Sequence, residues 1–215
     1  MPSRVPRLVR RSHLLAALAV AIGGAMPAGA QTLSGDLTVD NVFTAYLSTS
    51  ASSTAGATLL SSGANWASTY SFGPTALTPG TTYYLLIQAV DQGAPGAFVG
   101  DFTLSGTGFQ FANGLQTLTT NTTDWSASRV GFGGAAVGIM DRGADGVGPW
   151  GDRAGIDNAA RNIWEAGDCG NCTVYFSTTI AATTSSVVPE PGTYVLFSSG
   201  LVGLAIAARL RRQRA

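Results

Sequence analysis

The C-terminal segment, residues 188–215, predicts a tail inserted in a membrane and so limits the part of the chain that can fold in water. It holds Val188-Pro189-Glu190-Pro191, then an apolar run from Tyr194 to Ala208, then four arginines. Two prolines flanking a glutamate cannot continue a helix and favour an extended peptide. The apolar run would span only about 22 Å as a helix, but residues 192–210 would reach about 28 Å and cross a thinned bilayer. We therefore expect a single transmembrane helix that leaves the basic end in the cytoplasm, namely Arg209, Arg211, Arg212 and Arg214.

The order of these parts resembles the PEP-CTERM sorting signal, in which a Pro-Glu-Pro peptide, a short apolar span and a basic end follow one another. The matching residues are Pro189, Glu190 and Pro191, the run Gly200-Leu201-Val202-Gly203-Leu204-Ala205, and Ala207-Ala208-Arg209-Leu210-Arg211-Arg212. The resemblance implies a Gram-negative bacterium, an exosortase that cleaves near the Pro-Glu-Pro peptide, and delivery to the cell envelope or extracellular matrix. A permanently membrane-anchored surface protein is the alternative.

The N-terminal segment, residues 1–30, predicts a secretory signal peptide. Four arginines precede an apolar run from Leu14 to Ile22, and Ala28-Gly29-Ala30 supplies an A-x-A cleavage site before Gln31. A basic region, an apolar region and small residues at the cleavage site are the parts that define such a peptide. We therefore expect signal peptidase to leave Gln31 as the first residue of the exported chain.

The part between these two segments is acidic. Residues 31–188 hold four arginines and eleven carboxylates, a formal charge of −7, and contain no lysine and no histidine. Nucleic acids are bound through many phosphate contacts with lysine and arginine, so nucleic-acid binding is excluded. Without histidine or lysine, a Ser-His-Asp triad, a Cys-His pair, a lysine base and a histidine-ligated zinc site are excluded as well.

Residues 31–180 predict an all-β exported domain, followed by a Ser/Thr linker over residues 181–187. Glycine is abundant, charge is sparse, and the length suffices for one hydrophobic core. Thr82–Val90 is apolar on both faces, which is typical of a central strand. Residues 157–166 predict a short helix capped by Asp157. The other expected strands are Val42–Leu47, Thr58–Ser61, Ala97–Leu104, Gly108–Ala112, Leu115–Thr119 and Thr173–Ile180.

Several stretches of this domain resemble galactose-binding-domain-like β-sandwiches. They are Asp40-Asn41-Val42-Phe43-Thr44-Ala45-Tyr46-Leu47, Gly63-Ala64-Asn65-Trp66, Tyr83-Tyr84-Leu85-Leu86-Ile87-Gln88-Ala89 and Pro95-Gly96-Ala97-Phe98-Val99-Gly100-Asp101-Phe102. Ile163-Trp164 and Val174-Tyr175-Phe176 resemble a strand pair that usually opens those domains and here comes last, as in a circular permutation. The resemblance implies a jelly-roll-like β-sandwich, glycan binding at loop tips in many relatives, and in some a structural calcium.

The stretch 141–152 is the candidate ligand loop, because it is too rich in glycine and aspartate for a regular element. Asp141, Asp145 and Asp152, together with Asp157 just beyond the stretch, offer hard oxygen ligands to calcium. The interpretation that we favour is that these aspartates cap turns through side-chain-to-backbone hydrogen bonds. Trp150 lies among glycines and aspartates and is expected to be exposed. The other tryptophans are expected in the core: Trp66, Trp125 and Trp164.

The remaining reactive residues do not form a catalytic constellation. Cys169 and Cys172 are the only cysteines and predict a disulfide in an oxidising compartment. Glu165 is the only glutamate between residues 31 and 188, and no acid pair is marked by its surroundings. We therefore expect no catalytic residue. A glycoside hydrolase that uses carboxylates is the enzymatic alternative that remains.

Together these features predict an exported, non-catalytic protein of the cell envelope or of an exopolysaccharide matrix. Its expected partners are signal peptidase, an exosortase and, transiently, the inner membrane. Weak binding of exopolysaccharide is expected through the 141–152 stretch. No cofactor is expected apart from the calcium that this stretch allows.

Overall fold

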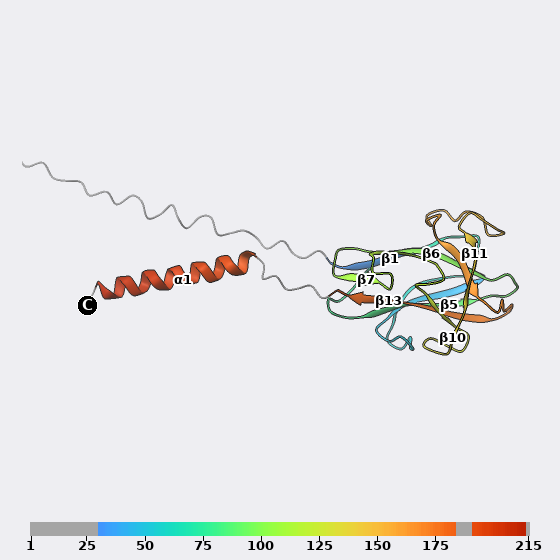
Figure 1. Cartoon of the computed structure of the whole chain (residues 1–215), viewed down its shortest axis with the longest axis horizontal. Helices are drawn as coiled ribbons and strands as arrows, with labels where there is room; N and C mark the ends of the chain where they lie inside the picture. Colours follow the sequence, from blue (N-terminus) through green and yellow to red (C-terminus); the bar gives the residue numbers. More distant parts are fainter. Residues whose placement is uncertain (1–29, 184–190, 214–215) are drawn as a thin grey trace, which may run out of the picture. The chain divides into compact units, whose positions relative to one another are not determined.

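The computed structural model describes residues 30–183 and 191–213 of the 215-residue chain. These residues form two units, a β-sandwich and the helix α1, Pro191–Arg212 (Figure 1). The predicted signal peptide up to Gly29, residues 184–187 of the predicted linker, and Pro189, Glu190 and Arg214 lie outside the described residues.

The first sheet of the sandwich, called the β1/β6 sheet below, has six antiparallel strands among the described residues. In spatial order they are β11 (Ile139–Ala144), β12 (Arg161–Glu165), β6 (Ala97–Leu104), β1 (Thr32–Asp40) and β4 (Tyr70–Ala76), while β8 (Thr117–Thr119) pairs with β6. The strand β1 lies inside the sheet, because it pairs with β6 from Leu33 to Asp40 and with β4 on its other edge.

The second sheet, called the β5/β13 sheet below, has seven antiparallel strands in the described part of the chain. In spatial order they are β10 (Ala136–Val137), β9 (Ser126–Ser128), β13 (Thr173–Ala182), β5 (Tyr83–Val90), β2 (Val42–Ser48) and β3 (Thr58–Gly63), while β7 (Phe109–Phe111) pairs with β13. The strand β5 pairs with β13 and with β2, so the predicted central strand is central.

The two sheets pack face to face because their strands turn apolar side chains inward at every second residue. Figure 1 shows β1 and β6 in one layer and β5 and β13 in the other. Phe98 of β6 contacts Trp125 with ring centroids 5.0 Å apart and Phe176 of β13 with centroids 5.2 Å apart. The inward residues of β1 and β13 are fully or almost fully buried: Leu33, Leu37, Val39, Val174, Phe176 and Ile180.

The prediction of a β-sandwich is confirmed, and each of the seven predicted strands is found with ends that differ by two residues or fewer. The last strand reaches Ala182, so residues 181 and 182 belong to β13 and not to a linker. The finer assignment to a jelly-roll-like topology stays a prediction. Trp125 and Trp164 are buried in the core, as expected from the sequence.

Two local predictions between β11 and β13 are wrong. Residues 157–166 do not form a helix: the backbone N–H of Ala160 bonds to the carbonyl of Asp157 in a turn, and Arg161–Glu165 then pairs with β11. The stretch 141–152 is not wholly a loop, because its first four residues belong to β11. In both places cross-strand pairing replaces the local structure that composition favours.

The helix α1 carries Arg209, Arg211 and Arg212 in its last turn. No helix in the described residues is long and apolar enough to cross a membrane, so the predicted transmembrane helix is not confirmed. Polar and small residues interrupt the apolar run of the sequence and lower its mean hydropathy: Ser198, Ser199, Gly200 and Gly203.

Gly96, which precedes β6, lies directly against the indole of Trp164. A Cβ atom at position 96 would lie 2.5 Å from this buried ring, closer than any real contact. We expect Gly96→Ala to lower the free energy of unfolding by about 1–3 kcal/mol, because the core must shift to admit the methyl group. Urea denaturation followed by tryptophan fluorescence measures the change.

Gly93→Ala is the matched control, since Gly93 lies in the same connection between β5 and β6. A Cβ atom there meets nothing within 4 Å. We expect its free energy of unfolding to equal or slightly exceed that of the unchanged chain, because alanine restricts the unfolded state. Equal losses in the two variants would contradict the packing of Gly96 against Trp164.

Candidate functional site

The segment between β11 and β12 covers the outer face of the β1/β6 sheet, the face turned away from the core. Ile156 and Ala160 form a small second apolar cluster with Val99 of β6. Trp150 is only 6% exposed, and its Nε1–H donates to Asp40 Oδ2 over 2.9 Å. The prediction that Trp150 is exposed is therefore wrong, because an apolar contact and a hydrogen bond fasten the segment to the sheet.

The aspartates of this segment bond to the chain itself. Asp141 accepts the backbone N–H of Gly143 through Oδ1 and the guanidinium of Arg161 through Oδ2, each over 2.8 Å. Asp145 Oδ2 accepts the backbone N–H of Arg153 over 3.0 Å. Among the described residues, no three side chains of histidine, cysteine, aspartate or glutamate are arranged to hold a metal ion. The arrangement of Asp141 and Asp145 thus agrees with turn capping, the interpretation favoured from the sequence.

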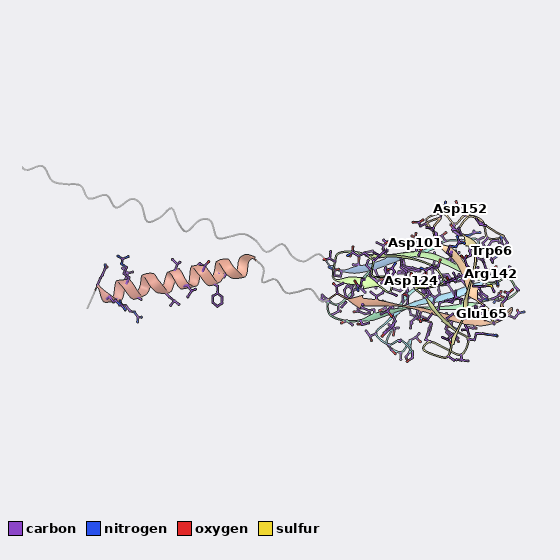
Figure 2. All side chains as sticks on the ribbon, in the orientation of Figure 1. Trp66, Asp101, Asp124, Arg142, Asp152 and Glu165 are labelled. Carbon is purple, nitrogen blue, oxygen red and sulfur yellow. A yellow bond between two sulfur atoms is a disulfide. The ribbon has the colours of Figure 1, made fainter. Side chains whose placement is uncertain are left out.

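Asp152 is exposed and lies on the outer side of the β1/β6 sheet (Figure 2). Trp66 is 38% exposed, so its predicted place in the core is wrong. The guanidinium carbon of Arg153 lies 5.3 Å from the centre of the Trp66 ring, and Nη1 of Arg153 donates to the carbonyl of Ala67 over 2.9 Å. Arg153 therefore covers one face of the Trp66 ring, so that face is closed to a stacking sugar.

The residues considered for catalysis and for the disulfide form one turn after β12. Glu165 is buried, and its two carboxylate oxygens accept the backbone N–H groups of Gly167, over 2.9 Å, and Cys169, over 2.6 Å. A disulfide joins Cys169 to Cys172, and the carbonyl of Cys169 accepts Nε1–H of Trp164 over 3.3 Å. Glu165 is therefore used to shape the chain before β13.

Several carboxylates lie beneath or beside the covering segment. Burial raises the pKa of Asp40, Asp101 and Asp145 above the ordinary 3.8, and hydrogen bonds offset this only in part. Asp101 lies directly opposite Asp36 in the pairing of β6 with β1, and this second negative charge adds to the rise in the pKa of Asp101. These three carboxyl groups therefore keep their protons up to a higher pH than an ordinary aspartate does.

The predicted cleavage sites have different surroundings. Gln31 is held at the edge of the sandwich: its carbonyl accepts the backbone N–H of Leu77, and its Oε1 accepts the backbone N–H of Gly108 over 3.1 Å. The carbonyl of Ala30 accepts Oγ–H of Ser105 over 3.3 Å. In the tail, Pro191 is the first residue of α1, a position where the missing amide hydrogen of proline costs nothing.

A cleft on the outer face of the β5/β13 sheet was missed in the sequence. It has a volume of about 420 Å³ and lies over strands β5, β13 and β9. The signal that marks it is the alternation of β13, where every outward residue from 173 to 179 carries a hydroxyl group. The strand residues with a side-chain hydroxyl that turn outward and line it are Tyr84, Ser126, Ser128, Tyr175, Ser177 and Thr179.

The raised pKa values predict the direction in which stability depends on pH. The folded chain binds protons at Asp40, Asp101 and Asp145 more tightly than the unfolded chain does. The contribution of these protons to the free energy of unfolding is therefore complete below pH 3.8, and it is lost as the pH rises through the folded pKa values. We expect Asp145→Asn to raise the free energy of unfolding near pH 7 and to flatten its change down to about pH 4. Urea denaturation over this pH range measures both effects.

Asp141→Asn is the control of opposite sign. Burial acts to raise the pKa of Asp141, but the bonds from Gly143 and Arg161 outweigh it and leave the pKa below 3.8. The contribution of Asp141 is present above that ordinary value and is lost as the pH falls through the lower folded pKa. We therefore expect Asp141→Asn to lower the free energy of unfolding near neutral pH. If Asp145→Asn lowers the free energy of unfolding at neutral pH, then burial of the charged Asp145 carboxylate does not destabilise the folded chain as we infer.

Comparison with known families identifies the tail. Residues 187–212 match the PEP-CTERM protein-sorting motif, so the predicted sorting signal is confirmed. No curated protein and no solved structure matches the chain, and the galactose-binding-like assignment of the sandwich stays a prediction. The matched motif indicates an exported protein that is processed by an exosortase.

Proposed function

We propose that this chain is a non-catalytic protein whose β-sandwich is placed in the cell envelope or the extracellular matrix after an exosortase cuts its tail near Pro189, Glu190 and Pro191. The match of residues 187–212 to the sorting motif carries this proposal. The sandwich supports it as well, because the described residues 30–183 belong to one compact unit and α1 belongs to the other. Removal of the tail would therefore leave the hydrophobic core of the sandwich complete.

The start of the sandwich supports cleavage by signal peptidase before Gln31. The side chain and the backbone carbonyl of Gln31 are both bonded to other parts of the sandwich. A chain that begins at Gln31 keeps these two bonds, and it also keeps the whole of β1. The partners in this proposal are signal peptidase and the exosortase, with the inner membrane as the place of processing.

The bonding of Glu165 supports a non-catalytic role for this residue. Glu165, the one glutamate between residues 31 and 188, has both oxygens bonded to backbone N–H groups of its own turn. A carboxylate pair that hydrolyses glycosides needs one acid to face the scissile bond and a second one about 5–9.5 Å away. A buried carboxylate with both oxygens engaged cannot take either part without opening the turn.

Replacement of the Pro-Glu-Pro peptide tests the sorting. We expect Pro189→Ala, Glu190→Ala and Pro191→Ala together to leave the intact C-terminus on the protein, because the exosortase loses the peptide near which it cuts. Mass spectrometry of the envelope fraction and of the medium measures the C-terminal residue. The matched control replaces Thr184, Ser185 and Ser186 by alanine, outside the matched residues, and should be processed normally. An intact C-terminus on the unchanged protein in its final location would favour the permanent anchor.

Glu165→Gln separates a structural from a catalytic role of this side chain. An amide nitrogen must then face one of the two backbone donors, so we expect a loss of about 1–3 kcal/mol in the free energy of unfolding. Thermal and urea denaturation measure this loss. A chain that hydrolyses a polysaccharide and loses this activity in Glu165→Gln at unchanged stability would show the proposal to be wrong.

A further inference from the structure

The cleft on the outer face of the β5/β13 sheet has a floor made by neighbouring strands in register. Ser177 of β13 lies between Leu86 of β5 and Ser126 of β9, and one step along the sheet Thr179 lies opposite Tyr84. These side chains point away from the core, because the residues between them on each strand are the inward ones. Leu86 is fully buried and does not line the cleft, whereas Tyr84, Ser126, Ser177 and Thr179 do. The floor is thus a fixed surface on regular structure.

Two surface loops form part of the rim of this cleft. A Cβ atom at Gly133 would lie 2.6 Å from Cβ of Ser52, so the loop after β9 and the loop after β2 touch each other. The ring of Phe132 packs edge-on against Tyr175 with centroids 5.0 Å apart, which limits the positions of the tyrosine. Because the Tyr175 side chain is already restricted, it loses less conformational entropy when a ligand binds.

The hydroxyl groups in the cleft are available to a ligand. Among the described residues, the side-chain hydroxyls of Tyr84, Ser126, Ser177 and Thr179 make no hydrogen bond within the protein. Asp124 has its Oδ2 occupied by the side-chain amide of Asn121 over 2.9 Å, while its Oδ1 has no partner in the described part of the chain. These groups offer several donors and acceptors within one concave surface.

Charge selects the class of ligand. Among the described residues, no lysine or arginine lines the cleft and Asp124 is its one charged residue. Residues 31–188 carry a formal charge of −7. A phosphate, a sulfate or a uronic acid would therefore be repelled without a compensating cation. Alanine residues and the tyrosine rings supply apolar patches between the hydroxyls. Hydroxyls combined with apolar patches match a sugar ring, which has hydroxyls at its edge and C–H groups on its faces.

We propose that this cleft binds a segment of a neutral polysaccharide. The volume of about 420 Å³ lies in the range of small-molecule sites, which hold about 300–1,000 Å³. This inference rests on the proposed function, since only an exported sandwich meets a matrix polymer. It replaces the 141–152 stretch as the predicted polysaccharide site, because that stretch is packed on the other sheet and Trp150 is buried.

Affinity electrophoresis of the full chain tests the proposal. The gels contain dextran or guar galactomannan as neutral polymers, or alginate as a polyuronate. The full chain includes the apolar tail and is kept in a detergent without a sugar headgroup, because such a headgroup would compete for the cleft. We expect at least one neutral polymer to retard the chain and alginate not to retard it. Retardation by no neutral polymer, or stronger retardation by alginate, would overturn the proposal.

Two cleft variants and one control connect binding to the cleft. We expect Ser177→Val with Thr179→Val, and separately Tyr175→Ala, to weaken retardation at least about tenfold, because hydroxyl donors or the ring are removed. Thr103→Val is the control, since Thr103 is an exposed, outward-facing threonine of β6 in the other sheet. Equal weakening by Thr103→Val would also overturn the proposal. Thermal denaturation identifies any variant that fails to fold, and Tyr84→Phe, which loses only a hydroxyl, then takes its place.

The two proposals fail in different experiments. Normal processing of the tail together with no retardation by any neutral polymer would remove the cleft as a site and leave the sorting intact. Retardation that depends on Ser177 and Thr179, in a chain whose tail is not cut, would remove the sorting proposal and leave the cleft.

Discussion

The contact of Phe98 with Trp125 and Phe176 joins the two sheets, because Phe98 belongs to β6 and Phe176 to β13. Rings of this size bury the largest apolar surfaces in the sandwich and fix how the inner faces meet. Trp164 adds a further ring against Phe176, with centroids 5.9 Å apart. These four rings lie in the inner layer, and each sheet also has an outer face whose side chains decide what can cover it.

The two outer faces differ in this respect. Val99 turns an apolar side chain outward from β6, and Ile156 and Ala160 of the segment between β11 and β12 cover it. On the other sheet β13 turns Tyr175 and Ser177 outward, which water can solvate, and no comparable apolar cluster forms there in the described residues. One face is therefore closed by the chain itself, and the other keeps a cleft.

Period-two alternation and turn residues predicted seven strands of the sandwich, yet β1 was missed although it lies inside a sheet. Its alternation is interrupted by Gly35, which is needed because a Cβ atom there would lie 2.5 Å from the ring of Phe102. The sequence predicts Trp150 to be exposed and Trp66 to be buried, and the structure shows the opposite. Trp150 is held by Asp40, a contact across 110 residues that no local pattern reveals. The outward hydroxyls of β13 are visible in the sequence, but the loops at the rim of the cleft come from other strands.

The sorting tail could be read directly from the sequence because its parts act in linear order, whereas binding by the sandwich depends on residues brought together by folding. The binding of a neutral polymer proposed for the cleft would depend on hydroxyl and ring contacts, each of which is worth little against water. A polysaccharide repeats the same unit along its length, so many copies of the sandwich can engage one chain of it. For a single copy of the sandwich, the repeated units would raise the apparent affinity only through the number of equivalent positions that they offer. Avidity would require copies of the sandwich to be joined to one another.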